Sequence, residues 1–199
     1  MKRQTFKFKP FSRKQRMTLN WWTEASPVKN YSGIIADGAI RSGKTISMSL
    51  SFVIWAMSTF SGQNFAMCGK TIGSFRRNVL FWLKLMLRSR GYSITDHRAD
   101  NLVVVRKDGK ENYFYIFGGK DERSQDLIQG ITLAGVFFDE VALMPESFVN
   151  QATGRCSVEG SKFWFNCNPD GPYHWFKMTT QWTLYVISAA QYLATDLQN

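Results

Sequence analysis

Residues 38–45 read Gly-Ala-Ile-Arg-Ser-Gly-Lys-Thr, which fits the pattern of a glycine, four free positions and then Gly-Lys-Thr. Where such a turn leads into a helix, several backbone N–H groups point at one spot, and the helix N-terminus adds partial positive charge. This arrangement suits the phosphates of a nucleotide, with Lys44 reaching the outer phosphates and the Thr45 hydroxyl bound to Mg²⁺. The other residues expected around the phosphates are Gly38, Arg41, Ser42 and Gly43.

The segments on either side of this turn have the composition that the site requires. Residues 33–36 are Gly-Ile-Ile-Ala and predict a short buried strand. Apolar residues then recur at helical spacing along residues 46–57 and predict a helix with one buried face. A strand, a glycine-bearing turn and a helix in this order favour a phosphate-binding (Walker A) loop over a chance match.

A second signature lies at residues 135–140, which read Gly-Val-Phe-Phe-Asp-Glu. A bulky apolar run that ends in two acids is the Walker B pattern, because a buried strand delivers both carboxylates to the edge of a sheet. Asp139 is expected to hold Mg²⁺, and Glu140 to polarise the water that attacks the γ-phosphate. Alone, this pattern also fits a capped strand end; after a complete Walker A loop it favours an ATPase.

Three further side chains are candidates, each with a plainer alternative. Gln15 lies early in a helix that Ser12 can cap, where it either pairs with the adenine edge or is an ordinary exposed glutamine. Asn168 follows a strand and precedes a proline, so it is either a sensor near the γ-phosphate or a turn residue. Arg76 belongs to a basic helix predicted for residues 74–90, which either acts on a neighbour's nucleotide or is simply solvated.

Composition limits the classes of protein that remain. The chain has 199 residues, 44% of them hydrophobic, and a net charge of +10, which favours a polyanionic partner. Its three cysteines form no CxxC pair, so we expect neither a zinc site nor a disulfide framework, and a reduced cytoplasmic setting fits best. The uncharged stretch 45–69 is interrupted by serines and Gly62, so a buried helix, a turn and a strand describe it better than a membrane span.

The remaining elements follow from periodicity and turn signals. Asp108–Gly109 predicts a tight hairpin turn between two strands. A helical turn is expected at 124–129. Strands are predicted at 64–68, 92–95, 102–105, 113–117, 162–166 and 183–187, and helices at 12–23 (with Met17, Trp21 and Trp22 on its apolar side), 145–152 and 189–197.

Taken together, these motifs resemble the ATPase domain of a tailed-phage terminase large subunit, the motor that packages viral DNA. The order and spacing of the motifs carry the resemblance over roughly residues 11–175. The matching residues are Phe11, Ser12 and Gln15, the loop at 38–45, Lys70–Thr71, Phe137–Glu140, Asn168–Pro169 and His174–Trp175.

The resemblance implies a three-layer α/β P-loop fold with a mainly parallel sheet and an extra strand between the Walker A and Walker B strands. It implies ATP hydrolysis with Mg²⁺, in which Lys44 and Thr45 bind phosphate and metal, Asp139 binds the metal and Glu140 is the catalytic carboxylate. The segment Asn166–Pro169 is then the motif that couples hydrolysis to DNA movement.

The implied partners are double-stranded DNA, a homo-oligomeric ring, the portal protein and the terminase small subunit, with no membrane. The implied location is the cytoplasm of the infected bacterial host, transiently at the procapsid portal.

We expect residues 1–32 to form a basic arm and helix, 33–175 the ATPase domain, and 176–199 a segment of uncertain role. Terminases usually continue into an RNase H-type nuclease, which 199 residues are too few to hold, so no nuclease is expected. In related loops an arginine often stands at the position that Ile40 occupies here. Because the arginine of this chain lies one position later, the resemblance gives weaker support to Arg41 as an arginine finger that acts within its own subunit.

Several other functions remain open from the sequence. One is a non-catalytic or oligomer-dependent component that binds nucleotide or DNA until a neighbour supplies an arginine. Another is a DNA-stimulated, helicase-like ATPase outside packaging, although a second motor domain does not fit in the chain. A small-molecule kinase is disfavoured by the basic charge and by the Asp139–Glu140 pair, which favours water as nucleophile.

Overall fold

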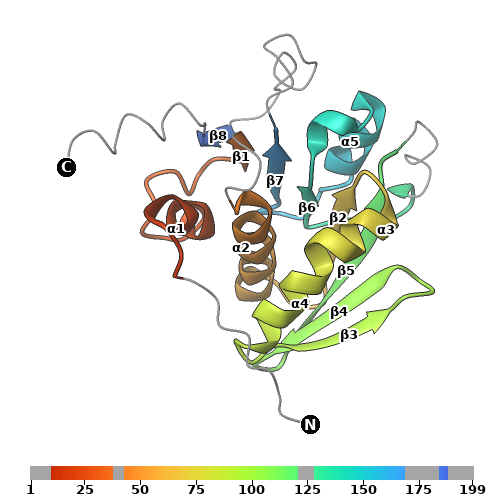
Figure 1. Cartoon of the computed structure of the whole chain (residues 1–199), viewed down its shortest axis with the longest axis horizontal. Helices are drawn as coiled ribbons and strands as arrows, with labels where there is room; N and C mark the ends of the chain where they lie inside the picture. The colour runs from red at the N-terminus through yellow and green to blue at the C-terminus, as the bar shows by residue number, and fades with distance from the viewer. Residues whose placement is uncertain (1–9, 38–42, 121–127, 169–183, 188–199) are drawn as a thin grey trace.

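A single sheet organises the structure, a computed structural model that describes residues 10–37, 43–120, 128–168 and 184–187 (Figure 1). Across it the strands follow the order β3-β4-β5-β2-β6-β7-β1-β8. Neighbours from β5 to β8 run parallel, whereas β3 and β4 extend the sheet antiparallel beyond β5. The strands are β1 Gly33–Asp37, β2 Asn64–Gly69, β3 Ser93–His97, β4 Leu102–Lys107, β5 Lys110–Gly118, β6 Gly135–Phe138, β7 Lys162–Cys167 and β8 Leu184–Ile187.

The strand order places the two sequence motifs near each other. β7 lies between β1, which precedes the Walker A loop, and β6, which carries the Walker B run. The predicted extra strand between the two motif strands is therefore confirmed. Because these strands are parallel, their carboxyl ends meet at one edge, where α/β proteins bind ligands.

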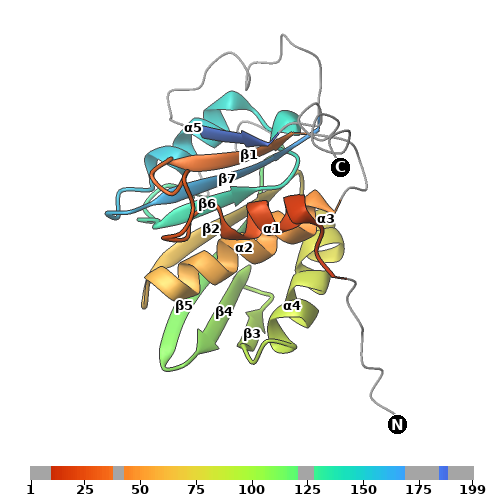
Figure 2. The same cartoon turned by 90° about the vertical axis from the view of Figure 1, so that its left-hand side faces the viewer.

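Side chains alternate across the strands and define three layers. Ile34 and Phe137 belong to the core on one face, whereas Ile35 and Phe138 belong to the core on the other. Figure 2 shows α1 and α2 on one face of the sheet and α5 on the other, and the buried residues of α4 belong to the same core as those of α2. Both faces are covered, which explains why the central parallel strands β2, β6 and β7 are apolar over most of their length.

The helices follow the predicted order with small changes in their bounds. Pro145 is the N-cap of α5, and the φ angles of Asp108 and Gly109 are +50° and +76°, as a type I′ hairpin requires. The helices are α1 Arg13–Asn20, α2 Lys44–Thr59, α3 Ile72–Phe75, the π-helical turn η1 Arg76–Leu80, α4 Phe81–Arg88, the short 3₁₀ helix η3 Val141–Leu143 and α5 Glu146–Gly154.

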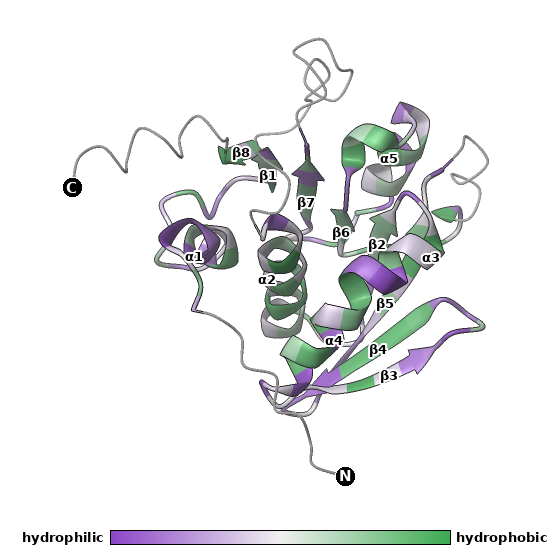
Figure 3. Ribbon diagram, viewed as in Figure 1, coloured by the Kyte–Doolittle hydropathy of each residue, from purple (hydrophilic) through white to green (hydrophobic). Residues whose placement is uncertain are grey.

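The central helix α2 is apolar along most of its length, as its green colour in Figure 3 shows. Its buried serines have specific partners: the Ser51 hydroxyl donates to the backbone carbonyl of Leu19 and accepts from the Trp164 indole N–H, each at 3.2 Å. These bonds join α1, α2 and β7, and so fix the helix that begins at the phosphate-binding loop. In the described part of the chain, no helix combines the length and hydrophobicity that crossing a bilayer requires.

Two helix predictions need correction. The predicted helix 12–23 ends at Asn20, and Met17 is not on its apolar side, since 44% of its surface is exposed; Thr18 is buried instead. The predicted helix 74–90 begins at Ile72, because the Thr71 side chain caps it and pairs reciprocally with Ser74. It also contains the π-helical turn, which apolar periodicity did not predict.

Other predictions lie outside the described residues, namely most of the turn at 124–129, the helix at 189–197, and Pro169, His174 and Trp175. The strand predicted at 183–187 is confirmed as β8, an edge strand that pairs with β1. Residues 184–187, for which the sequence suggested no role, thus complete the same sheet.

Candidate nucleotide site

A cavity of about 360 Å³ lies where β6 and β7 end and α2 begins. The two sequence motifs meet in it, together with two residues from the helix of η1 and α4. It is lined by Gly43, Lys44, Thr45, Ile46, Asn78, Trp82, Asp139, Glu140, Asn166 and Asn168.

Lys44 is held by the end of β7. Its ammonium Nζ donates to the Cys167 carbonyl and to the Asn168 side-chain oxygen, each at 3.0 Å, and the residue is only 7% exposed. Burial lowers the pKa of the Lys44 ammonium below its usual value, while the nearby carboxylates of Asp37 and Asp139 act in the opposite direction. The structure therefore brings Lys44 and Asn168 together, as the sequence predicted for two residues of one phosphate site.

Gly43 and Gln15 are in close contact at the start of α2. The φ of Gly43 is +78°, and a Cβ atom built on it would lie 2.4 Å from the Gln15 side-chain nitrogen. The left-handed φ favours glycine at this position, whereas the Gln15 amide ends a flexible side chain that could shift. The Gln15 amide oxygen also accepts from the Ser12 backbone N–H at 2.9 Å, in a capping box at the start of α1. Gln15 thus lies against the loop, as expected of a residue that contacts the nucleotide, whereas its pairing with adenine stays a prediction.

Thr45, Asp139 and Asn166 form a closed hydrogen-bonded group. The Asn166 amide nitrogen donates to Thr45 Oγ1 at 2.8 Å and to Asp139 Oδ1 at 2.6 Å, and the Thr45 hydroxyl donates to the same Asp139 oxygen at 3.2 Å. Burial raises the pKa of Asp139 to about 6; the hydrogen bond from Asn166 opposes this rise, and the charge of Glu140 adds to it. The site therefore holds a buried carboxylate that a cation would stabilise.

These residues fit Mg²⁺. A carboxylate and a hydroxyl are hard oxygen ligands, and Mg²⁺ is usually held by one or two carboxylates together with substrate phosphates. The side-chain oxygen of Asn166 is buried and has no hydrogen-bond partner among the described residues, so the asparagine at this site retains an unused acceptor. Within the described residues, no three His, Cys, Asp or Glu side chains gather in one place.

Glu140 has an unusual backbone conformation. Its φ and ψ are 59° and 49°, in the left-handed region that non-glycine residues rarely adopt. The chain therefore turns sharply after β6, and both Asp139 and Glu140 line the cavity. Such backbone strain is common where a side chain is positioned for function. Glu140 is exposed, whereas Asp139 is buried, so the two acids have the different environments that their two expected roles require.

Arg76 lies elsewhere. Its guanidinium donates to Asp96 on β3 at 2.8 Å, its side chain is 16% exposed, and it does not line the cavity. The structure thus gives Arg76 an ion-pair partner within this chain, whereas its action on a neighbour's nucleotide stays a prediction. Gly38, Arg41 and Ser42 lie outside the described residues.

Four residues that line the cavity were absent from the predicted site residues, namely Ile46, Asn78, Trp82 and Asn166. Asn166 had a signal, since it ends an apolar strand beside the predicted sensor Asn168. Asn78 and Trp82 had no such signal in the sequence, because only the fold brings their helix to the cavity.

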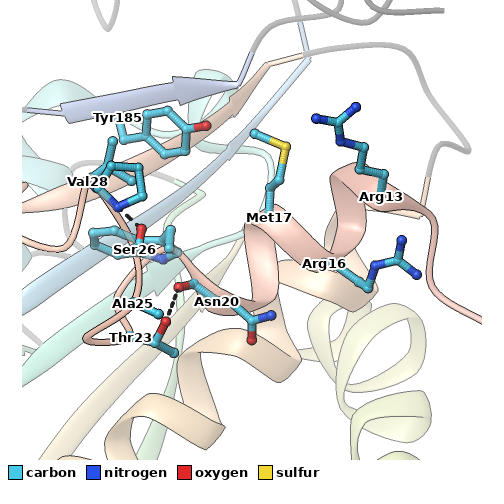
Figure 4. A pocket seen from close by; sticks show the side chains of 11 residues that line it. Arg13, Arg16, Met17, Asn20, Thr23, Ala25, Ser26, Val28 and Tyr185 are labelled. Carbon is cyan, nitrogen blue, oxygen red and sulfur yellow. Dashed lines mark hydrogen bonds between the residues drawn. The ribbon is translucent and has the colours of Figure 1, made fainter. Parts of the chain in front are cut away.

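A larger cavity of about 460 Å³ lies between α1 and β8, with Arg13, Met17 and Tyr185 around it (Figure 4). It contains none of the predicted site residues, so size alone does not mark the nucleotide site.

The parallel sheet, the Walker loop before α2 and the acid pair after β6 define a P-loop nucleoside triphosphatase. Residues 35–196 match the family described as "Terminase large subunit, T4likevirus-type, N-terminal". The chain therefore belongs to the terminase large-subunit family, over the N-terminal part of that protein.

Solved structures agree with this assignment. The large terminase of a thermophilic bacteriophage is 65% identical with a TM-score of 0.87, and the match covers 90% of this chain and 46% of that chain. The same terminase in complex with ATP-gamma-S is 61% identical, with a TM-score of 0.84 and coverage of 90% and 44%. The present chain thus spans less than half the length of these relatives.

A more distant structure supports the fold alone. The ATPase domain of the Thermus phage P74-26 large terminase is 18% identical, with a TM-score of 0.58 over 82% of this chain and 66% of that chain. A search of curated proteins found no match.

Proposed function

We propose that this chain is the ATP-hydrolysing motor domain of a phage terminase large subunit, which drives double-stranded DNA into a procapsid. The observation that carries the proposal is the convergence of Lys44, Asp139 and Glu140 on one cavity. Complexes of the related thermophilic-phage terminase with ADP and with ATP-gamma-S support a nucleotide as the ligand.

Each residue has a role that follows from its position. Lys44 neutralises the outer phosphates and exchanges its bonds to the end of β7 for bonds to phosphate oxygens. Asn166 orients the carboxylate of Asp139 and the hydroxyl of Thr45, which together would hold Mg²⁺. When bound, the metal supplies charge that stabilises the transferring phosphoryl group.

Glu140 accepts a proton from the attacking water, which it polarises as a general base. Hydrolysis of ATP with water then yields ADP and phosphate. The activation barrier is lowered further because the site positions the reactants and stabilises the negative charge of the transition state. The bond between Lys44 and Asn168 gives a route from the phosphates to the end of β7, because a bound phosphate would compete with Asn168 for the same ammonium.

A second candidate function is supported by one feature of the cavity. Among the described residues that line it, Lys44 is the one cationic side chain. Phosphoryl transfer usually needs a further cation, and an arginine from an adjacent subunit supplies it in many ring motors. We therefore propose that activity depends on a homo-oligomeric ring, assembled on the portal in the host cytoplasm with the small subunit as partner.

ATP hydrolysis by the purified chain, measured over a range of protein concentrations with and without duplex DNA, tests this function. Specific activity is expected to rise with protein concentration and with DNA, and to require Mg²⁺. Nucleotide binding without turnover under every condition would favour a non-catalytic assembly component. Specific activity independent of concentration would contradict the need for a neighbour.

A further inference from the structure

The cavity has a wall that neither Walker motif supplies. Asn78, in the π-helical turn η1, and Trp82, in α4, line it together with Lys44 and Glu140. Side chains four residues apart share one side of a helix, so Asn78 and Trp82 belong to one continuous face. That face meets the nucleotide site.

The π-helical turn has a direct signature in the backbone. The N–H of Phe81 donates to the carbonyl of Arg76, five residues earlier, instead of four. The wider turn changes which side chains face the cavity, and such turns occur mostly at functional positions. Val79 and Leu80 in the same turn are buried in the core, so the turn is packed rather than frayed.

The helix is also anchored on its far side. Asp96 on β3 accepts from Arg76 at 2.8 Å and from Lys84 at 2.7 Å, and all three side chains are less than one-fifth exposed. Arg76 precedes Asn78 in the chain and Lys84 follows Trp82, so the two ion pairs hold the helix against the β3–β4 hairpin on either side of these residues. A rigid support of this kind positions a side chain for a ligand with little loss of conformational freedom.

The two wall residues differ in their present contacts. The Asn78 side chain is exposed and makes no hydrogen bond with any other described residue, although an amide has two donors and an acceptor. Trp82 is half-buried and lies edge-on to Phe81, with ring centroids 5.1 Å apart. The wall thus combines one polar group available to a ligand and one supported aromatic ring.

The surrounding residues indicate which part of a nucleotide this wall meets. Lys44, Thr45 and Asp139 are expected to bind the outer phosphates and the metal, and they line the same cavity. Gln15, the expected adenine contact, does not line it. The wall therefore faces the phosphate end of the site.

We propose that the Asn78 amide donates a hydrogen bond to the terminal phosphate of ATP, and that Trp82 forms the adjoining surface, so that this helix distinguishes ATP from ADP. The inference rests on the proposed nucleotide function and adds a specificity-determining residue to it. Because an ADP-bound site lacks the γ-phosphate, the Asn78 contact exists in one nucleotide state only. The ion pairs to Asp96 then connect that contact to the β3–β4 hairpin.

Calorimetric binding of ATP-gamma-S and of ADP tests the proposal. Asn78→Ala is expected to weaken ATP-gamma-S binding about tenfold, as for a lost hydrogen bond to a charged group, while ADP binding changes by less than about twofold. Asn78→Asp is expected to weaken ATP-gamma-S further, because it places a carboxylate against phosphate. The matched control is Asn150→Ala, at an exposed position of α5, which should leave both affinities unchanged.

Trp82→Phe provides a second readout that does not depend on affinity. The chain has seven tryptophans, and this substitution is expected to remove the part of the fluorescence change that ATP-gamma-S produces beyond ADP. Equal effects of Asn78→Ala on the two nucleotides, or none on either, would overturn the proposal while leaving the proposed function intact. If the unsubstituted chain bound neither nucleotide, the proposed function itself would fail.

Discussion

The Asn166 side-chain amide donates a 2.6 Å hydrogen bond to the carboxylate of Asp139, across the boundary between β7 and β6. The same amide nitrogen donates to Thr45 at the start of α2, so one asparagine joins the three elements that carry the site. We expect Asn166→Ala to lower ATP turnover roughly 10- to 100-fold, as loss of a residue that orients a metal ligand commonly does.

The control for this variant is Asn166→Asp, which keeps the shape but replaces the donor with a second carboxylate. It should be at least as impaired as Asn166→Ala, because two like charges then lie side by side. Turnover close to that of the unsubstituted chain in both variants would show that Asn166 does not position Asp139.

The buried carboxylate of Asp139 makes stability depend on pH in a defined direction. Its pKa is about 6 in the folded chain, against 3.8 for an ordinary aspartate, so the folded state binds the proton more tightly. Above pH 6 the charged group therefore destabilises the ligand-free fold, by roughly 3 kcal/mol at 1.36 kcal/mol per pKa unit. This penalty disappears as the pH falls from 6 to 4.

Asp139→Asn tests this dependence, because it removes the charge and keeps the shape. Urea unfolding at pH 4 to 8 is expected to show the variant more stable than the unsubstituted chain above pH 6, with the two converging near pH 4. A stability difference that does not change with pH would contradict the raised pKa.

One substitution can separate the capping role of Gln15 from its predicted contact with the nucleotide. Its side-chain oxygen completes the capping box of α1, and its nitrogen lies against Gly43. Gln15→Glu keeps the capping oxygen, since glutamate serves equally well at this helix position, but it loses the amide donor. We expect unchanged thermal stability and a weaker preference for ATP over GTP in competition binding. Loss of stability with an unaltered ATP preference would assign Gln15 to helix capping alone.

Asn112 supports the end of α2 opposite the phosphate site. It is fully buried; its amide donates to the Phe60 carbonyl at 2.9 Å, and its oxygen accepts from the Gln63 backbone N–H at 3.0 Å. Asn112→Ala leaves these partly buried backbone groups without their side-chain partner, so we expect a loss of about 1–3 kcal/mol in the free energy of unfolding. Urea unfolding measures it, with exposed Asn150→Ala as the control; a similar small effect of both substitutions would count against this role.

The sequence predicted the parallel core of the fold well, because buried strands in such sheets are continuous apolar runs. It also predicted Lys44, Thr45, Asp139 and Glu140, since their motifs are local in the chain; the structure brings these four residues into one cavity. The roles assigned to them remain predictions, which substitutions must test.

The features that the sequence did not predict depend on contacts between distant segments. Asn78 reaches the cavity through a π-helical turn, which apolar periodicity does not reveal. Arg76 looked like a free cation on a basic helix, but its partner Asp96 lies on a strand 20 residues later. Met17 sits at an apparently apolar helix position that the fold leaves exposed.

We propose that Glu140 activates water for ATP hydrolysis in a site where Lys44 and Asp139 hold the nucleotide. The most direct test compares steady-state ATP turnover and nucleotide affinity for the unsubstituted chain and Glu140→Gln, in the presence of Mg²⁺ and duplex DNA. We expect Glu140→Gln to bind ATP with unchanged affinity and to lose at least about 100-fold in turnover, the contribution typical of a general base. Hydrolysis retained by Glu140→Gln at the rate of the unsubstituted chain would rule out Glu140 as the general base.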